Sequence, residues 1–213
     1  MAKRNSDPSI CLRKSVRIWD RSTRTPTTLH TLRPVSPPAS SASPWIPTST
    51  EGAGPEDLAK LRREHIGFIF QSYHLFPTLT ALDNVRLALD VRGEPARPAQ
   101  AKAKEAMMTV GLSHKIKSYP RELSGGEQQR VAIARAIVGS PSAVLADEPT
   151  AALDSVTGQI VMKVLAEIAK NPARGVLVVA HDRRIIPFAN RIIHIEDGRI
   201  VSVEPGPAGS NSR

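Results

Sequence analysis

The chain has 213 residues, a single cysteine and a formal net charge of +9, from 29 Lys/Arg against 20 Asp/Glu. This length is enough for one full domain, and the lone Cys11 excludes an internal disulfide scaffold and favours a reducing setting. No apolar run approaches the roughly 20 residues of a membrane-spanning helix, so we expect a chain that is soluble by itself.

The excess positive charge belongs to the first fifty residues. They carry 8 Lys/Arg against 2 Asp/Glu and 7 prolines, with no glycine and little periodicity. We therefore expect residues 1–50 to be a disordered or non-native basic segment. Basic segments can attract nucleic acid, but no helical or aromatic pattern organises such a site here, and we expect no nucleic-acid partner.

Regular patterns begin near Glu51 and alternate between helices and short apolar strands. A charged helix is expected from Pro55, followed by a strand. That strand covers residues 66–70. The further elements in chain order are helices 81–91, 99–110 and 125–138, strand 143–146, helix 155–169, strand 176–179 and two strands turned at Asp197-Gly198. This alternation predicts an α/β fold with a parallel sheet over residues 51–204, and a disordered tail over 205–213.

A glycine pair stands at the start of one predicted helix, in the sequence LSGGE at residues 123–127. Gly125 and Gly126 allow close approach to the backbone, and the amides at a helix N-terminus favour an anion. The alternative is an ordinary helix start with Ser124 as the N-cap. The residues alone do not decide between these two interpretations.

Four polar side chains follow three predicted strands. Asp147 and Glu148 come after strand 143–146, where open α/β sheets place their ligands. Asp147 could hold Mg²⁺ and Glu148 could orient an attacking water, although two acids in a turn are also common. His181 and Gln71 follow two other strands, as a possible γ-phosphate donor and a possible ligand of the metal and the water; either could also be an ordinary hydrogen-bonding residue.

Taken together, these motifs resemble the ATP-binding-cassette (ABC) ATPases over roughly residues 55–203. Gln71 resembles the Q-loop glutamine, and His181 resembles the switch histidine. The stretches LSGGEQQR (123–130), AVLADE (143–148) and AALD (151–154) are similar to the signature motif, the Walker B strand with its glutamate, and the D-loop with Asp154. Within the family, the stretches 75–85 and 180–201 are similar to the lipoprotein-release, macrolide-export and glycolipid-export type, although Ala180 stands where threonine is frequent.

The resemblance implies a P-loop NTPase-like fold with a helical subdomain over about residues 72–122. It also implies ATP and Mg²⁺ as cofactors, with Gln71, Ser124, Gly125, Gly126 and Asp154 binding nucleotide, Glu148 and His181 in catalysis, and Asp147 and Gln71 at the metal. Two such subunits would close head to tail around ATP and drive a transmembrane permease. The chain would then be cytoplasmic and peripheral at the inner face of the membrane.

The phosphate loop of that family is missing from the sequence. It needs G-x-x-x-x-G-K-[ST], because glycine amides wrap the phosphates and the lysine supplies charge. No glycine precedes residue 52 and no Gly-Lys pair occurs anywhere. We therefore expect a sheet that is incomplete at the N-terminus, and hypothesise that residues 1 to about 50 are out of frame or unrelated. The chain is then either an impaired ATPase subunit or a non-hydrolysing partner that lends its signature to an intact subunit.

Overall fold

The structure is a computed structural model that describes residues 10–14 and 54–209. Its centre is one six-stranded sheet in the order β2-β3-β4-β1-β5-β6. The strands are β1 (Ile10–Lys14), β2 (Ile66–Ile69), β3 (Ala143–Asp147), β4 (Gly175–Val179), β5 (Arg191–Glu196) and β6 (Arg199–Pro205). The first five are parallel, and β6 runs antiparallel to β5. The predicted α/β fold with a parallel sheet is confirmed.

Strand β1 was not anticipated, because it lies in the segment expected to have no regular element. It pairs in parallel with β4 on one side and β5 on the other, so that Leu12 is the register partner of Val178 and of Ile192. The sheet is therefore continuous between β4 and β5, although we expected it to be incomplete at the N-terminus. The other residues of 1–50 lie outside the described part of the chain.

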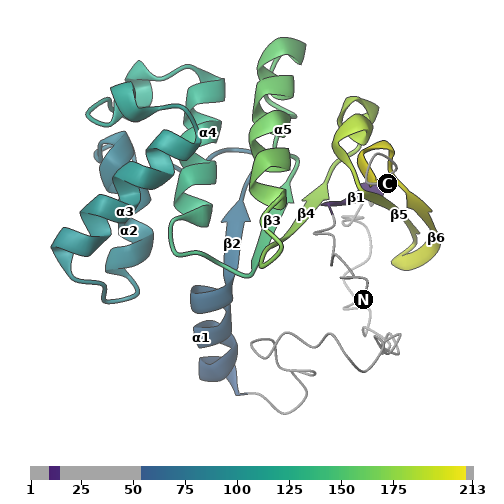
Figure 1. The fold of residues 1–213 in the computed structure, drawn as a ribbon, viewed down its shortest axis with the longest axis horizontal. Coiled ribbons are helices and arrows are strands. Elements are labelled where there is room, and N and C mark those ends of the chain that lie inside the picture. The colour runs from purple at the N-terminus through teal and green to yellow at the C-terminus, as the bar shows by residue number, and fades with distance from the viewer. Residues whose placement is uncertain (1–9, 15–53, 210–213) are drawn as a thin grey trace, which may run out of the picture.

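The described residues form five α-helices: α1 (Pro55–His65), α2 (Ala81–Asp90), α3 (Ala96–Thr109), α4 (Gly125–Ile137) and α5 (Ser155–Ala169). Helices α4 and α5 lie side by side over one face, whereas α2 and α3 pack on each other and on α4, away from β1, β5 and β6 (Figure 1). Helix α2 begins where the Thr80 hydroxyl accepts the Asp83 amide N–H. Both α2 and α3 fall inside the stretch predicted to be a helical subdomain.

The hydrophobic core lies between the sheet and helices α4 and α5 and continues between α4 and helices α2 and α3. Ile69, Ala146 and Val178 point into it from neighbouring strands and are almost fully buried. Helix α4 lies against Gly67 on β2, where an added Cβ would lie 2.2 Å from the Ala136 carbonyl oxygen of α4. A glycine at this position therefore lets the helix contact the strand backbone directly.

The chain after β6 turns back onto the start of β5. The Gly206 N–H donates to the Asn190 carbonyl at 2.8 Å, and the Ala208 N–H donates to the Ala189 carbonyl at 3.1 Å. Residues 205–209 of the predicted disordered tail thus make backbone hydrogen bonds, and residues 210–213 lie outside the described part. No helix within residues 54–209 is long and apolar enough to cross a membrane.

Candidate functional site

Three parallel strands bring the predicted acidic and histidine residues to one edge of the sheet. Asp147, the last residue of β3, is the register partner of Val179, the last residue of β4. Ile69, at the end of β2, is paired with Ala146. Since the carboxyl ends of parallel strands share an edge, Gln71, Asp147, Glu148 and His181 all follow strands at that edge.

Glu148 and His181 are in direct contact. The distance between His181 Nδ1 and Glu148 Oε1 is 2.7 Å, and this hydrogen bond together with the carboxylate charge raises the pKa of His181 above its ordinary value. The Glu148 N–H also donates to the Val179 carbonyl at 2.8 Å, and its φ of 47° lies in the left-handed region. Sequence reasoning placed these two residues after two different strands but predicted neither that the strands are neighbours nor that the two side chains are bonded.

A side chain of α4 forms hydrogen bonds to the backbone of the loop that contains Gln71. Tyr73 and His74 have φ values of 61° and 49°, two consecutive left-handed residues that are not glycine. Arg135 of α4 donates to both of their carbonyl groups, at 2.7 Å to Tyr73 and 2.5 Å to His74. Arg135 was absent from the sequence interpretation, and no local signal could have found it, since the contact spans some sixty residues.

The glycine pair stands at the first turn of α4, as predicted. Ser124 is the N-cap: its hydroxyl accepts the Glu127 N–H at 3.3 Å, and the Glu127 carboxylate accepts the Ser124 N–H at 2.8 Å. This reciprocal pair lowers the pKa of Glu127. An added Cβ on Gly126 would meet Thr157 Cγ2 at 2.0 Å. Ser124 therefore has the ordinary capping role, while anion binding stays a prediction.

The glycine pair and the Glu148–His181 pair are separate features. Within residues 54–209, no hydrogen bond or ion pair joins Ser124, Gly125 or Gly126 to Glu148 or His181. An added Cβ on Gly125 would instead lie 3.0 Å from the Tyr73 hydroxyl oxygen. The tyrosine belongs to the loop that contains Gln71, so the start of α4 adjoins that loop.

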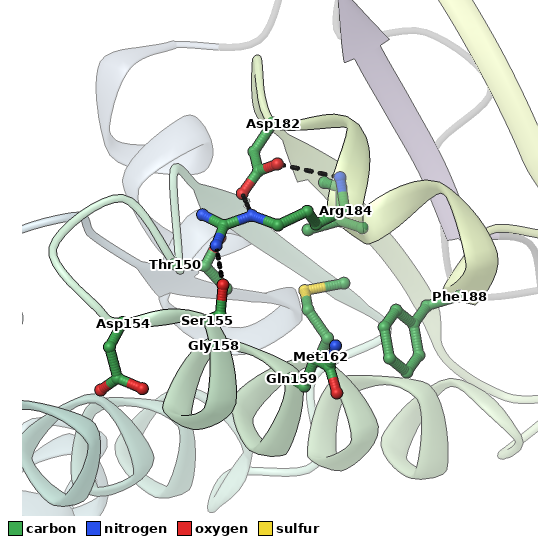
Figure 2. Close-up of a pocket in the computed structure, with 10 residues that line it drawn as sticks. Thr150, Asp154, Ser155, Gly158, Gln159, Met162, Asp182, Arg184 and Phe188 are labelled. Atoms are coloured by element: carbon green, nitrogen blue, oxygen red, sulfur yellow. Dashed lines mark hydrogen bonds and ion pairs between the residues drawn. The ribbon is translucent and has the colours of Figure 1, made fainter.

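Asp154 is the N-cap of α5. Its carboxylate accepts the N–H groups of Val156 and Thr157, each at 3.0 Å, and these bonds lower the pKa of Asp154. Next to it, Arg184 donates to the Asp182 carboxylate at 2.7 Å and to the Ser155 hydroxyl. Figure 2 shows the Arg184 guanidinium over the start of α5, while the Asp154 carboxylate points away from it. No sequence pattern indicated this bridge.

The residues at the sheet edge fit a divalent cation better than they fit a triphosphate. Mg²⁺ is usually bound through one or two protein oxygen ligands together with phosphates and waters, and Asp147 and Gln71 offer oxygen ligands after adjacent strands. Within the described residues, no group of three or more His, Cys, Asp or Glu forms an all-protein metal cage. The phosphate cradle does not fit, because the sequence has no Gly-Lys pair.

A parallel sheet with acids after one strand, a histidine after the next and a glycine pair at a helix start is typical of α/β proteins with a P-loop NTPase-like fold. A profile of the family described as ABC transporter matches residues 46–151. The solved structure of the ATP-binding cassette MJ0796, a dimer in a post-hydrolysis state bound to ADP and Pi, is 39% identical with a TM-score of 0.64, covering 73% of this chain and 69% of that one. A second dimeric MJ0796 structure is 40% identical with a TM-score of 0.63, covering 71% of this chain and 67% of that one. The chain belongs to the ABC transporter ATPase family.

The curated relatives that the chain matches are described as macrolide export ATP-binding/permease proteins. The macrolide export ATP-binding/permease protein MacB of Salmonella typhimurium is 47% identical over 151 residues, which are 71% of this chain and 23% of that protein. The protein of the same description from Nitrosomonas europaea is 40% identical over 176 residues, or 83% of this chain and 27% of that protein. The chain thus matches about a quarter of the length of these relatives.

Proposed function

We propose that the chain acts as the ATP-binding subunit of an export-type ABC transporter and that its own nucleotide site is impaired. The observation that carries this proposal is the Glu148–His181 bond, which joins an acid and a base at the ends of two adjacent strands. Residues in such a pair can orient and polarise a water molecule. The missing Gly-Lys pair is what makes the same site deficient in phosphate binding.

In this proposal each of the four polar residues at the sheet edge has one task. Asp147 and Gln71 would hold Mg²⁺, Glu148 would orient the water, and His181 would donate to the terminal phosphate. Bound ATP supplies the phosphoanhydride bond whose hydrolysis releases the free energy. The partners are a transmembrane permease and a second ATPase subunit, and the chain works at the cytoplasmic face of the membrane. Support comes from the dimeric MJ0796 structures and from the permease portion in the names of the MacB relatives.

One observation favours a second function, that of a non-hydrolysing partner. The first turn of α4 is intact: Ser124 caps the helix, Gly126 packs against Thr157, and the segment needs no phosphate loop of its own chain. Such a chain can lend Ser124, Gly125 and Gly126 to the nucleotide of an intact subunit, whereas two copies of it would contain no phosphate loop.

A complementation assay separates the two functions. The partner is the ATPase portion of a MacB relative in which the signature serine is changed to arginine. The homodimer of this partner then has no ATPase activity. ATP turnover that appears only on mixing, and that Ser124→Arg in this chain abolishes, supports the partner function. Turnover by the pure chain that Glu148→Gln abolishes supports the ATPase function. A folded chain that is inactive both alone and in the mixture contradicts both.

A further inference from the structure

Helix α4 contains a polar side chain in the core to which the proposed function gives no task. Gln129 is completely buried, and its Nε2 donates to the Pro149 carbonyl at 2.9 Å. Since a carbonyl group can only accept, this contact fixes which end of the amide faces Pro149. The other end, Gln129 Oε1, is buried and has no hydrogen-bond partner within the described part of the chain. A buried acceptor without a partner lowers stability, so this side chain is poorly suited to packing alone.

The Pro149 carbonyl belongs to the loop that follows β3. Proline has no N–H, so at this residue the backbone can be anchored only through its carbonyl group. Gln129 reaches that carbonyl from a different element, across 20 positions of the chain, and both residues are buried. Gln129 therefore anchors the loop to α4 directly after Glu148.

The backbone of Glu148 has an unfavourable conformation for two reasons. Its φ of 47° lies in the left-handed region, which glutamate rarely adopts. A residue before proline also prefers the extended region. Such a conformation persists only where the surrounding contacts enforce it. Here there is an anchor on each side, because the Glu148 N–H donates to the Val179 carbonyl at 2.8 Å and the Pro149 carbonyl accepts from Gln129.

This backbone conformation sets the direction of the Glu148 side chain. Its Oε1 lies 2.7 Å from Nδ1 of His181. The rotamers open to a side chain depend on the backbone angles of its residue. If Glu148 relaxed to the extended region, its Cβ would point in a different direction and the carboxylate would leave His181. The contact between the acid and the base therefore depends on the anchor at Pro149.

We propose that Gln129 is a positioning residue: by holding the Pro149 carbonyl, it keeps Glu148 in the left-handed conformation and the Glu148 carboxylate in contact with His181. The part of Gln129 in catalysis rests on the proposed function, whereas the placement of the carboxylate requires no ATP. The test is therefore made on the full chain without nucleotide. A failure of the chain to hydrolyse ATP would leave the result of this test unaffected.

Gln129→Met removes the anchor and keeps the site filled. Methionine is similar in length to glutamine and adapts to a core, but it has no N–H to donate to Pro149. We expect the pKa of His181, followed by NMR, to fall toward 6.5, because the carboxylate that raises it moves away. The Glu148 N–H should exchange about ten times faster, as expected for the loss of one net hydrogen bond. A residue that only packs would lower the urea midpoint and leave the His181 pKa at its native value.

The matched control is Gln128→Met on the same helix, which removes an amide that donates to the Leu123 carbonyl at 3.1 Å. This control should leave the His181 pKa and the exchange of the Glu148 N–H unchanged. A native His181 pKa in folded Gln129→Met overturns the proposal, and so does an equal fall in the control. If Gln129→Met does not fold, the native chain provides the test. Its Gln129 side-chain amide and its Glu148 N–H should both be protected from hydrogen exchange, and free exchange of either overturns the proposal.

Discussion

Gly67→Ala tests the contact between β2 and α4 most directly. An alanine Cβ at this position would lie 2.2 Å from the Ala136 carbonyl oxygen and 2.9 Å from its carbonyl carbon. Real Cβ contacts do not fall below 3.0 Å, so the gap between strand and helix has to open by about 0.8 Å. The obstacle is backbone, which no change of rotamer can relieve.

The expected cost is that of overpacking a core, about 1–3 kcal/mol. For a chain of this size, that loss lowers Tm by roughly 3–10 °C. The matched control is Gly175→Ala on β4, where the nearest atom to an added Cβ is the Ser142 oxygen at 3.9 Å. This control should be neutral or stabilise by about 0.5 kcal/mol, since glycine weakens a strand.

Urea unfolding followed by circular dichroism measures both variants. Hydrogen exchange adds a second observation, since amides of α4 near Ala136 should exchange faster in Gly67→Ala than in Gly175→Ala. If the two variants unfold at the same urea concentration, α4 does not rest on the β2 backbone as described. The argument from close approach would then be refuted.

Glu148→Gln removes the charge that holds the His181 proton, so the His181 pKa should fall toward 6.5 in an NMR titration, and an unchanged value would contradict the bond. In the native chain this bond stabilises the folded state fully below pH 6.5, and that stabilisation is lost as the pH rises through the raised pKa of His181. Because the His181 side chain is 69% exposed, the bond contributes less than about 1 kcal/mol to the free energy of unfolding. Arg135→Ala should destabilise the folded state by about 1–3 kcal/mol and speed hydrogen exchange in the loop after β2, because the carbonyl groups of that loop lose their donor. The control Arg174→Ala removes another partly buried arginine and should leave hydrogen exchange in that loop unchanged. Ser124→Ala should cost about 1 kcal/mol in urea unfolding and Ser124→Asn almost nothing, because asparagine also caps helices; equal losses would show that the cap is unimportant.

The helices and strands after residue 54 were predictable because local signals mark them. Helix α5 is observed at Ser155–Ala169, the predicted range, since Asp154 caps its start and an apolar stripe runs along it. Helix α3 begins at Ala96, three residues earlier than predicted, because Pro95 can precede a helix without a capping side chain. Strand β2 ends at Ile69 and leaves Phe70 outside.

The contacts across the site were not predictable from the same signals. The bond between Glu148 and His181 depends on β3 and β4 being neighbours in register, which no local pattern specifies. Strand β1 has no alternation of its own, and only its pairing with β4 and β5 defines it. Local chemistry thus predicted which residue types gather at the sheet edge, and tertiary pairing decided which of them touch.

The left-handed backbone of Glu148 lowers the stability of the fold at a residue that we propose is needed for function. An L-residue at a φ of 47° costs about 1 kcal/mol relative to glycine, and asparagine tolerates this region better than glutamate does. A directed search for thermostable variants would therefore select Glu148→Gly or Glu148→Asn. Either change would raise Tm and discard the carboxylate that holds His181. A screen for stability alone would improve this protein by removing the residue that we propose orients the water.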